Sequence, residues 1–291
     1  MMDQHPPFII GVDGGGTGCR VAVGTAQDGI LAEAKGGRAN VSTNFDEAIA
    51  HIIEATHEAV KDAGQDAAQI NHAVAHLGLA GFTGPDIGKR VADALPFGKS
   101  VVTEDTTTTI VGAIGAEDGY VLALGTGTII ARQRDQAQTC IGGWCYQVSD
   151  QASGAWLGHG ALEQTLLAVD GIVPTSALSD RMLAKFGGAA GIVQFSLKAR
   201  PGDFGTLAPD VVETAAAGDP IGTMLMQRGA DYLQNALAAL EYQTNDLLCL
   251  AGGVGPHYAP YLPAQTTVNL APAKGRAVDG AFALAKSAAA Q

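Results

Sequence analysis

Short apolar runs that end on glycine-rich turns recur three times along the chain. The first two turns, Asp13–Gly18 and Gly125–Thr128, are each followed by a second apolar run, which predicts a β-hairpin. The third turn, Ala251–Gly255, is followed by Pro256, which suits the first turn of a helix. The flanking strands are predicted at 8–12 and 20–24, at 120–124 and 129–132, and at 247–250. Three such turns suggest one ligand that is held from several sides.

Between these turns the pattern is mostly helical. Apolar residues at helical spacing predict a helix over 45–60, with Asn44 or Thr43 as its cap. Further helices are predicted at 156–168, 222–240 and 278–290, and further strands at 72–79 and 100–105. The apolar segment 222–240 fits either a core helix or a dimer surface.

This alternation of strands and helices predicts an α/β protein, and the repeated hairpin predicts two similar lobes. We place the first lobe at residues 1–112 and the second at 113–291. The final helix, 278–290, is a candidate to pack back on the first lobe. No linker or low-complexity tract marks the boundary, so the two lobes are expected to share an interface.

The composition narrows the class of protein. With 47% hydrophobic residues in 291, the chain is apolar enough to bury real cores, and its 39 glycines show no collagen period. The formal charge of −12 argues against nucleic acid and anionic membranes as partners. No run reaches the roughly 18 apolar residues that span a bilayer, and the first residues do not resemble a signal peptide. We therefore expect a cytoplasmic protein.

The cysteines give little evidence of chemistry. Four of them in a chain of this size are too few for a disulfide scaffold. Cys140 and Cys145 have the spacing of a metal or cluster pair, but no second ligand pair stands nearby. Buried or idle thiols are therefore the favoured interpretation.

The glycine hairpins suit phosphate binding. Glycine lets backbone N–H groups approach an anion closely, and a threonine hydroxyl adds a donor. Neither the lysine-bearing P-loop nor the dinucleotide fingerprint is present, because a strand follows each turn where a helix would be needed. Asp13 would repel a phosphate directly, but it is well placed if Mg²⁺ lies between them, held through waters. For a single turn, an ordinary hairpin is an equally good interpretation.

Two further carboxylates are candidates for chemistry. Asp105 ends a predicted strand, where it could accept the proton of an attacking hydroxyl or merely cap the next helix. Asp150 lies in a loop of small and polar residues that also carries Trp144. That mixture suits a sugar, with the indole against the ring, but a turn whose tryptophan plugs the core fits equally well.

Taken in order, these motifs resemble one family. They are Asp13-Gly-Gly-Gly-Thr17, Asn40, Asp105, Gly125-Thr-Gly-Thr128, Gly142-Gly-Trp144, Asp150-x-x-Ser153-Gly154 and Ala251-Gly-Gly-Val254. The set is similar to the amino-sugar kinases of the BadF/BadG/BcrA/BcrD ATPase family, in the actin, hexokinase and Hsp70 superfamily, from about residue 8 to 285. The resemblance implies two ribonuclease-H-like lobes with ATP and Mg²⁺ in the cleft between them, and a homodimer.

The resemblance also implies roles for individual residues. The expected nucleotide contacts are Asp13, which would orient Mg²⁺, with Gly14, Gly15, Gly16, Thr17, Gly125, Thr126, Gly127, Gly252 and Gly253. The expected sugar contacts are Asn40, Asp105, Thr128, Gly143, Trp144 and Asp150. Asp105 would be the base that activates the 6-hydroxyl of the sugar.

The chain departs from the eukaryotic N-acetylglucosamine kinases at the sugar positions. Where these carry Ser-Asn after Gly-Thr-Gly, the chain has Thr128-Ile129, and where they carry Gly after Trp it has Cys145. Their Asp-Glu-Gly-Ser is Asp-Gln-Ala-Ser over 150–153, a form more like bacterial glucosamine kinases. We therefore favour free glucosamine over N-acetylglucosamine as the acceptor.

Two other functions fit parts of this pattern. One is an ATPase of the same superfamily that drives electrons to a dehydratase through an iron–sulfur cluster, for which Cys140 and Cys145 do not obviously supply the thiolates. The other is a non-catalytic sugar sensor. Sensors of this superfamily carry a DNA-binding segment, for which there is no room before Phe8.

Overall fold

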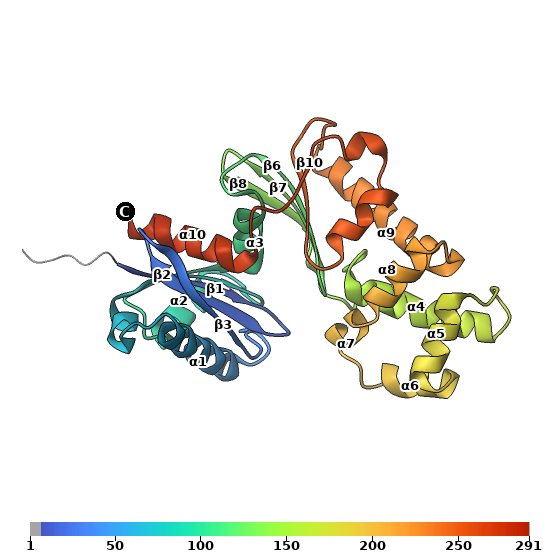
Figure 1. Cartoon of the computed structure of the whole chain (residues 1–291), viewed down its shortest axis with the longest axis horizontal. Helices are drawn as coiled ribbons and strands as arrows, with labels where there is room; N and C mark the ends of the chain where they lie inside the picture. The colour runs from blue at the N-terminus through green and yellow to red at the C-terminus, as the bar shows by residue number, and fades with distance from the viewer. Residues whose placement is uncertain (1–6, 291) are drawn as a thin grey trace, which may run out of the picture. The chain divides into compact units, whose positions relative to one another are not determined.

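The computed structural model describes residues 7–290, which form two units (Figure 1). Unit 1 contains the described residues up to Ala116 and those from Ala273 onward, and unit 2 contains Glu117–Pro272. Each unit is built on one five-stranded sheet with helices packed against it. The α/β class and the pair of similar sheets predicted from the sequence are confirmed.

The sheet of unit 1 has the strand order β3-β2-β1-β4-β5. The strands are β1 (Phe8–Gly14), β2 (Cys19–Thr25), β3 (Gly29–Gly36), β4 (Val74–Leu79) and β5 (Lys99–Glu104). The helices are α1 (Phe45–Asp62), α2 (Pro85–Ala94), α3 (Asp105–Ile114) and α10 (Ala277–Ala289), with a short 3₁₀ helix at Ala67–His72. Strands β1 to β3 form an antiparallel meander, whereas β4 and β5 run parallel to β1.

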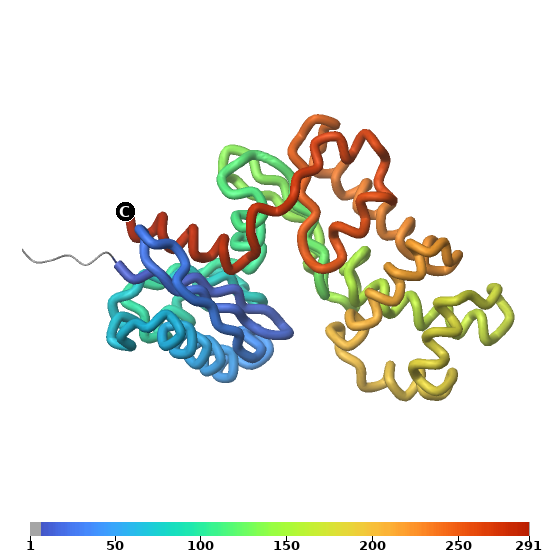
Figure 2. Tube along the Cα trace, in the orientation of Figure 1, coloured from blue at the N-terminus to red at the C-terminus, as the bar shows by residue number. Residues whose placement is uncertain are grey.

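Strand β1 is apolar from Phe8 to Val12 because both faces of the sheet are covered. Ile10 and Val12 belong to the core that contains residues of α1, and Ile9 packs with Val278 and Phe282 of α10. Figure 2 shows the last helix lying beside the first strands, although they are at opposite ends of the chain. Gly11 permits this approach, since a Cβ there would lie 2.4 Å from the backbone nitrogen of Phe282.

The sheet of unit 2 repeats the plan, with the order β10-β9-β6-β7-β8. Its strands are β6 (Gly119–Leu124), β7 (Thr128–Arg134), β8 (Ala137–Gly142), β9 (Leu248–Ala251) and β10 (Leu270–Ala271). Its helices are α4 (Gly154–Val169), α5 (Ala177–Phe186), α6 (Ala189–Ser196), α7 (Pro201–Gly205), α8 (Ala208–Ala216) and α9 (Pro220–Ala239), with 3₁₀ helices η2 (Gly255–Tyr261) and η3 (Ala264–Thr266).

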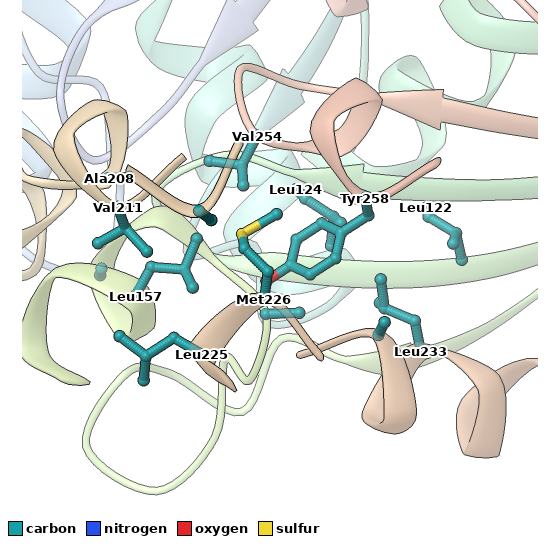
Figure 3. Close-up of a cluster of buried hydrophobic side chains, with 14 of the residues drawn as sticks. Leu122, Leu124, Leu157, Ala208, Val211, Leu225, Met226, Leu233, Val254 and Tyr258 are labelled. Atoms are coloured by element: carbon teal, nitrogen blue, oxygen red, sulfur yellow. The ribbon is translucent and has the colours of Figure 1, made fainter. Parts of the chain in front are cut away.

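Helix α9 lies in the core of unit 2. Its residues Leu225, Met226 and Leu233 pack in the buried cluster that also contains Leu122 and Tyr258 (Figure 3). The core interpretation of segment 222–240 is therefore the one that the structure supports.

The predicted helices and strands lie within about two residues of those observed. The lobe boundary differs, because the predicted change after residue 112 falls inside α3, which continues to Ile114. The units instead change after Ala116, and residues from Ala273 onward belong to unit 1, not to the second lobe. Within residues 7–290, no helix is both long and apolar enough to cross a membrane.

Candidate functional site

The first glycine turn of unit 1 is fixed at its base and open at its tip. Gly14 is packed so tightly that a Cβ would lie 2.6 Å from a methyl group of Leu79, and its carbonyl accepts a 2.7 Å hydrogen bond from the N–H of Ala80. By contrast, a Cβ on Gly16 would meet nothing within 4 Å. The turn therefore leaves room for a ligand against its backbone, as a phosphate-binding turn requires.

Asp13 and Asp105 lie at the same edge of the unit 1 sheet. Strands β1, β4 and β5 are parallel neighbours, so their carboxyl ends meet there. Asp13 is in register with Gly78 of β4, which is in register with Thr103 of β5, two residues before Asp105. Two strand spacings amount to about 10 Å. The two carboxylates predicted as metal-orienting group and base therefore share one site.

The Asp13 carboxylate is mostly buried, and the charges of Arg20 and, more weakly, Arg276 act on it. Arg20 of β2 lies 3.6 Å from its Oδ2. Burial raises the pKa of Asp13, and the charge of Arg20 opposes that rise only in part. A partly buried carboxylate with this environment is a suitable group to orient a divalent cation through water.

Asp105 is the first residue of α3, and the N-cap position is occupied by Glu104. The Glu104 side chain makes no capping hydrogen bond, whereas the Asp105 carboxylate accepts hydrogen bonds from the backbone N–H groups of Thr106 and Asp105, so the capping and base interpretations both stay predictions. Its main chain is held firmly, since the hydroxyls of Thr108 and Thr109 both donate to its carbonyl oxygen, at 2.9 and 2.8 Å. Burial, and then the nearby charge of Asp13, raise the pKa of Asp105 to about 6. Such a carboxyl group can exchange a proton near neutral pH.

Asn40 lies in the loop after β3, and the oxygen of its side-chain amide is already hydrogen-bonded. Its Oδ1 accepts from the N–H groups of Ser42 and Thr43, at 3.0 and 3.1 Å. Gly81 approaches the same side chain, and it is glycine with a φ of +81°. The backbone thus fixes the orientation of Asn40 and leaves its amide N–H₂ as the group that could meet a ligand.

The second and third glycine turns meet in unit 2. The N–H of Val254 donates to the carbonyl of Leu124 at 3.0 Å, and the N–H of Gly154, at the start of α4, donates to the carbonyl of Gly125 at 2.8 Å. Gly252 has a φ of +80°, and a Cβ there would lie 2.4 Å from the carbonyl oxygen of Leu124. These contacts place the two turns side by side.

A cavity of about 450 Å³ opens beside these two turns. It is lined by Gly125, Thr126, Gly154, Gly205, Ala208, Pro209, Val212, Glu213, Gly253, Val254 and His257. Three of these residues were predicted as nucleotide contacts, and a Cβ on either Gly125 or Gly253 would meet nothing within 4 Å. The cavity therefore leaves room for a ligand beside both glycine turns.

Several lining residues carry no signal in the sequence. They come from α7, α8 and η2, namely Gly205, Ala208, Pro209, Val212, Glu213 and His257. No motif marks them, because their role depends on how α7 and α8 pack against α4. Pro209, at the start of α8, is a sequence signal, but it predicts the start of a helix and not a ligand contact.

Asp150 lies against the second glycine turn. Its Oδ1 accepts from the N–H of Thr128 at 3.2 Å, and a Cβ on Gly127 would lie 3.1 Å from its Oδ2. Burial raises the pKa of Asp150, and the Thr128 hydrogen bond opposes the rise. Thr128 itself is buried and donates its hydroxyl to the carbonyl of Gln151 at 2.7 Å. The structure thus gives Thr128 a position that supports Asp150.

The loop around Asp150 contains non-glycine residues in the left-handed backbone conformation, which is unfavourable for them. Cys145, Asp150 and Ala152 have φ values of +72°, +63° and +68°, a region that non-glycine residues seldom adopt. Left-handed residues of this kind tend to cluster at ligand sites, where the surrounding structure maintains them. Three within eight residues mark this loop as a candidate binding loop.

Trp144 does not plug the core, since it is 76% exposed. Gly143 precedes it with a φ of +73° and lies against Ile129, which a Cβ would overlap at 2.6 Å. The indole therefore stands in solvent beside the Asp150 loop. Cys140 and Cys145 are also exposed, and no group of three metal-ligating side chains occurs in the part of the chain that the structure describes.

Comparison with known proteins gives the family and the fold. The sequence model of the BadF/BadG/BcrA/BcrD ATPase family matches residues 10–269. The glucosamine kinase GspK of Vibrio cholerae is 29% identical over 280 residues, which are 96% of this chain and 95% of the relative. A Chromobacterium violaceum protein that is provisionally assigned as an N-acetylglucosamine kinase superimposes with a TM-score of 0.89 at 31% identity, over 96% of this chain and 99% of that one.

More distant structures share only the fold. Component A of the (R)-2-hydroxyglutaryl-CoA dehydratase of Acidaminococcus fermentans has a TM-score of 0.54 and 14% identity, over 98% of this chain and 99% of that one. Together these matches confirm the predicted two-lobed, actin-like ATPase fold.

Proposed function

Because this chain belongs to the BadF/BadG/BcrA/BcrD ATPase family, we propose that it is a kinase that transfers the γ-phosphoryl group of ATP to an amino sugar. The observation that carries the proposal is Asp105, a partly buried carboxylate at the sheet edge beside the first glycine turn, with a pKa of about 6.

Asp105 would accept the proton of the sugar hydroxyl as it attacks. The acceptor is the 6-hydroxyl, the primary and least hindered hydroxyl of a hexosamine. The hydroxyls of Thr108 and Thr109 bond to the carbonyl of Asp105 and hold its main chain in the first turn of α3. A base that is preorganised in this way loses little orientational freedom during transfer.

The nucleotide would bind through the glycine turns. Thr126, Gly125 and Gly253 line the unit 2 cavity, whose apolar wall of small side chains suits the nucleoside. In unit 1, the open turn of Gly14–Thr17 would meet phosphate oxygens, and Asp13 would orient Mg²⁺. When bound, Mg²⁺ neutralises charge on the transferring phosphoryl group.

The acceptor is proposed to be glucosamine in preference to N-acetylglucosamine. Asn40, Asp150 and Trp144 offer a donor, a buried carboxylate and an exposed ring face, all of which suit a sugar. Ile129 packs against Gly143 and supplies no polar group there for an acetamide. The relative that is named a glucosamine kinase supports this choice, and the provisional N-acetylglucosamine kinase is its main competitor.

An ADP-release assay with ATP and Mg²⁺ tests the proposal across glucosamine, N-acetylglucosamine and glucose. We expect the highest kcat/KM with glucosamine, and the product to carry phosphate on O6 by NMR. Failure of all three sugars to release ADP above the level without sugar would reject the kinase, whereas a preference for N-acetylglucosamine would reject only the choice of acceptor.

A further inference from the structure

Glu213 is the one acidic side chain that lines the unit 2 cavity. It lies on α8, one residue after Val212 and one turn after Pro209, which both line the same cavity. The remaining lining of the cavity is mostly glycine and small apolar side chains. Besides Glu213, only Thr126 and His257 bring polar side chains to this lining. A cavity with so few polar groups uses each of them to orient its ligand.

The carboxylate of Glu213 is held in place from a neighbouring helix. Arg181 of α5 donates to Glu213 Oε2 at 2.7 Å and to Asp210 Oδ1 at 3.1 Å. Lys185, one turn further along α5, donates to Asp210 Oδ2 at 2.6 Å and completes the network. An exposed glutamate side chain normally samples many rotamers. Arg181 bridges Asp210 and Glu213, which lie one turn apart on α8, and this limits where the Glu213 carboxylate points.

The chemistry of the carboxylate indicates which groups of a ligand in the cavity it can bind. An ionised carboxylate only accepts hydrogen bonds. In an adenine nucleotide the donor groups of the nucleoside are the 6-amino group and the ribose hydroxyls. If the phosphates lie against Gly125 and Thr126, the nucleoside lies along the wall formed by Pro209 and Val212, next to Glu213.

We propose that Glu213, positioned by Arg181, accepts a hydrogen bond from the nucleoside and so selects the nucleotide. This inference rests on the proposed function, since it takes ATP as the ligand of the cavity. Glu213 is a specificity residue in this scheme, and Arg181 is a positioning residue that acts through it.

The test compares nucleotides that each lack one donor. Calorimetry would measure the Kd values of ADP, of IDP, which lacks the 6-amino group, and of dADP, which lacks the 2′-hydroxyl. The wild type should bind ADP about fivefold more tightly than at least one of the two analogues, the range expected for one partly exposed hydrogen bond to a charged group. In Glu213→Ala and Arg181→Met that preference should fall to about one.

Two matched variants control for charge and packing. Lys185→Met removes a cation from the same network without touching Glu213, and Glu58→Ala removes an exposed glutamate from helix α1. Both should keep the wild-type preference. A wild type without any preference, or a preference that Glu213→Ala leaves intact, would overturn the inference.

Gly253→Val separates this failure from failure of the proposed function. The backbone of Gly253 accepts a side chain without a clash, so valine fills part of the cavity and leaves the fold intact by circular dichroism. We expect ADP binding to weaken at least about tenfold. Unchanged ADP binding in this variant would remove the nucleotide from the cavity and overturn both ideas, whereas weakened binding together with an unaltered preference in Glu213→Ala would overturn the inference alone.

Discussion

The two units share a strand order but differ at the same point of their first hairpin. In unit 1 the residue directly before the glycines of the turn is Asp13. In unit 2 the residue directly before the first glycine of the turn is Leu124, which is 0% exposed. The repeated topology therefore fixes where the glycine turn lies, but a single residue decides whether that turn has an acid at its base. Only the unit 1 turn pairs with a second carboxylate, Asp105, across its sheet edge.

The units also differ in what stands between their sheet strands. Unit 2 inserts α4 to α9 between β8 and β9, and this insertion supplies most of the cavity wall. In unit 1 the corresponding stretch, between β3 and β4, contains only α1 and a short 3₁₀ helix. The comparison suggests that unit 1 supplies the reacting carboxylates and a phosphate-binding turn, whereas unit 2 supplies the nucleoside cavity and the exposed ring of Trp144.

The largest expected effect is on kcat when the base of unit 1 is removed. Asp105→Ala should lower kcat about 10³-fold, the usual scale of general base catalysis, because no other group of unit 1 is placed to take the proton. ADP affinity by calorimetry should stay within about twofold of wild type.

The matched control is Asp62→Ala, an exposed acid at the end of α1 with no hydrogen bond to the site. Its kcat should equal that of the wild type. If Asp105→Ala instead loses nucleotide affinity while kcat falls little, then Asp105 acts in binding, and the assignment of the reacting carboxylate to unit 1 is wrong.

The next effect concerns the third glycine turn of unit 2. Gly252→Ala should lower the free energy of unfolding by about 3 kcal/mol, since the residue has a φ of +80° and its Cβ would overlap the carbonyl oxygen of Leu124. Urea unfolding measures the change. Gly253→Ala, one residue on, has open space for its Cβ and should change stability by less than about 0.5 kcal/mol.

Equal losses in the two variants would mean that the turn is constrained by something other than the packing of Gly252 on Leu124. The pair thus separates the glycine that the fold needs from the glycine that leaves room for a ligand.

Much of this architecture could be predicted from the sequence because its signals are local. Apolar runs that end on glycine predicted both hairpins and the β9 turn, and helical spacing predicted α1 and α9. Of the two predicted caps of α1, Asn44 and Thr43, the structure has Asn44. The cavity wall could not be predicted, because Ala208, Val212 and Glu213 meet the glycine turns only through the packing of α7 and α8. The sequence predicted α10 as a candidate to pack on the first lobe, and it does belong to unit 1. The sequence does not distinguish Gly11, which permits this packing, from any other strand glycine.

The third prediction concerns the pH dependence of stability without nucleotide or Mg²⁺. Asp105 has a folded pKa of about 6, above its ordinary value of 3.8, so the folded state prefers the protonated form. Stability should therefore fall as the pH rises from about 4 to about 6 and stay lowered above that, by about 3 kcal/mol. Asp105→Asn removes this penalty.

The variant should accordingly be more stable than the wild type at pH 8, and the difference should shrink as the pH falls through 6 towards 4. Urea unfolding at several pH values measures it. A wild type that is as stable as Asp105→Asn at pH 8 would show that the charged carboxylate is well solvated, and would remove the physical reason for its raised pKa.

The smallest effect separates binding from chemistry within unit 2. Trp144 is exposed, so Trp144→Ala should change the free energy of unfolding by less than about 0.5 kcal/mol. The KM for glucosamine should rise about tenfold with kcat nearly unchanged, because a ring face that stacks on the sugar stabilises the ground state and the transition state alike. Val148→Ala, equally exposed in the same loop, is the control and should leave KM unchanged. A fall in kcat that matches the fall in kcat/KM would instead place Trp144 in the transition state, and unit 2 would then contribute to chemistry as well as to binding.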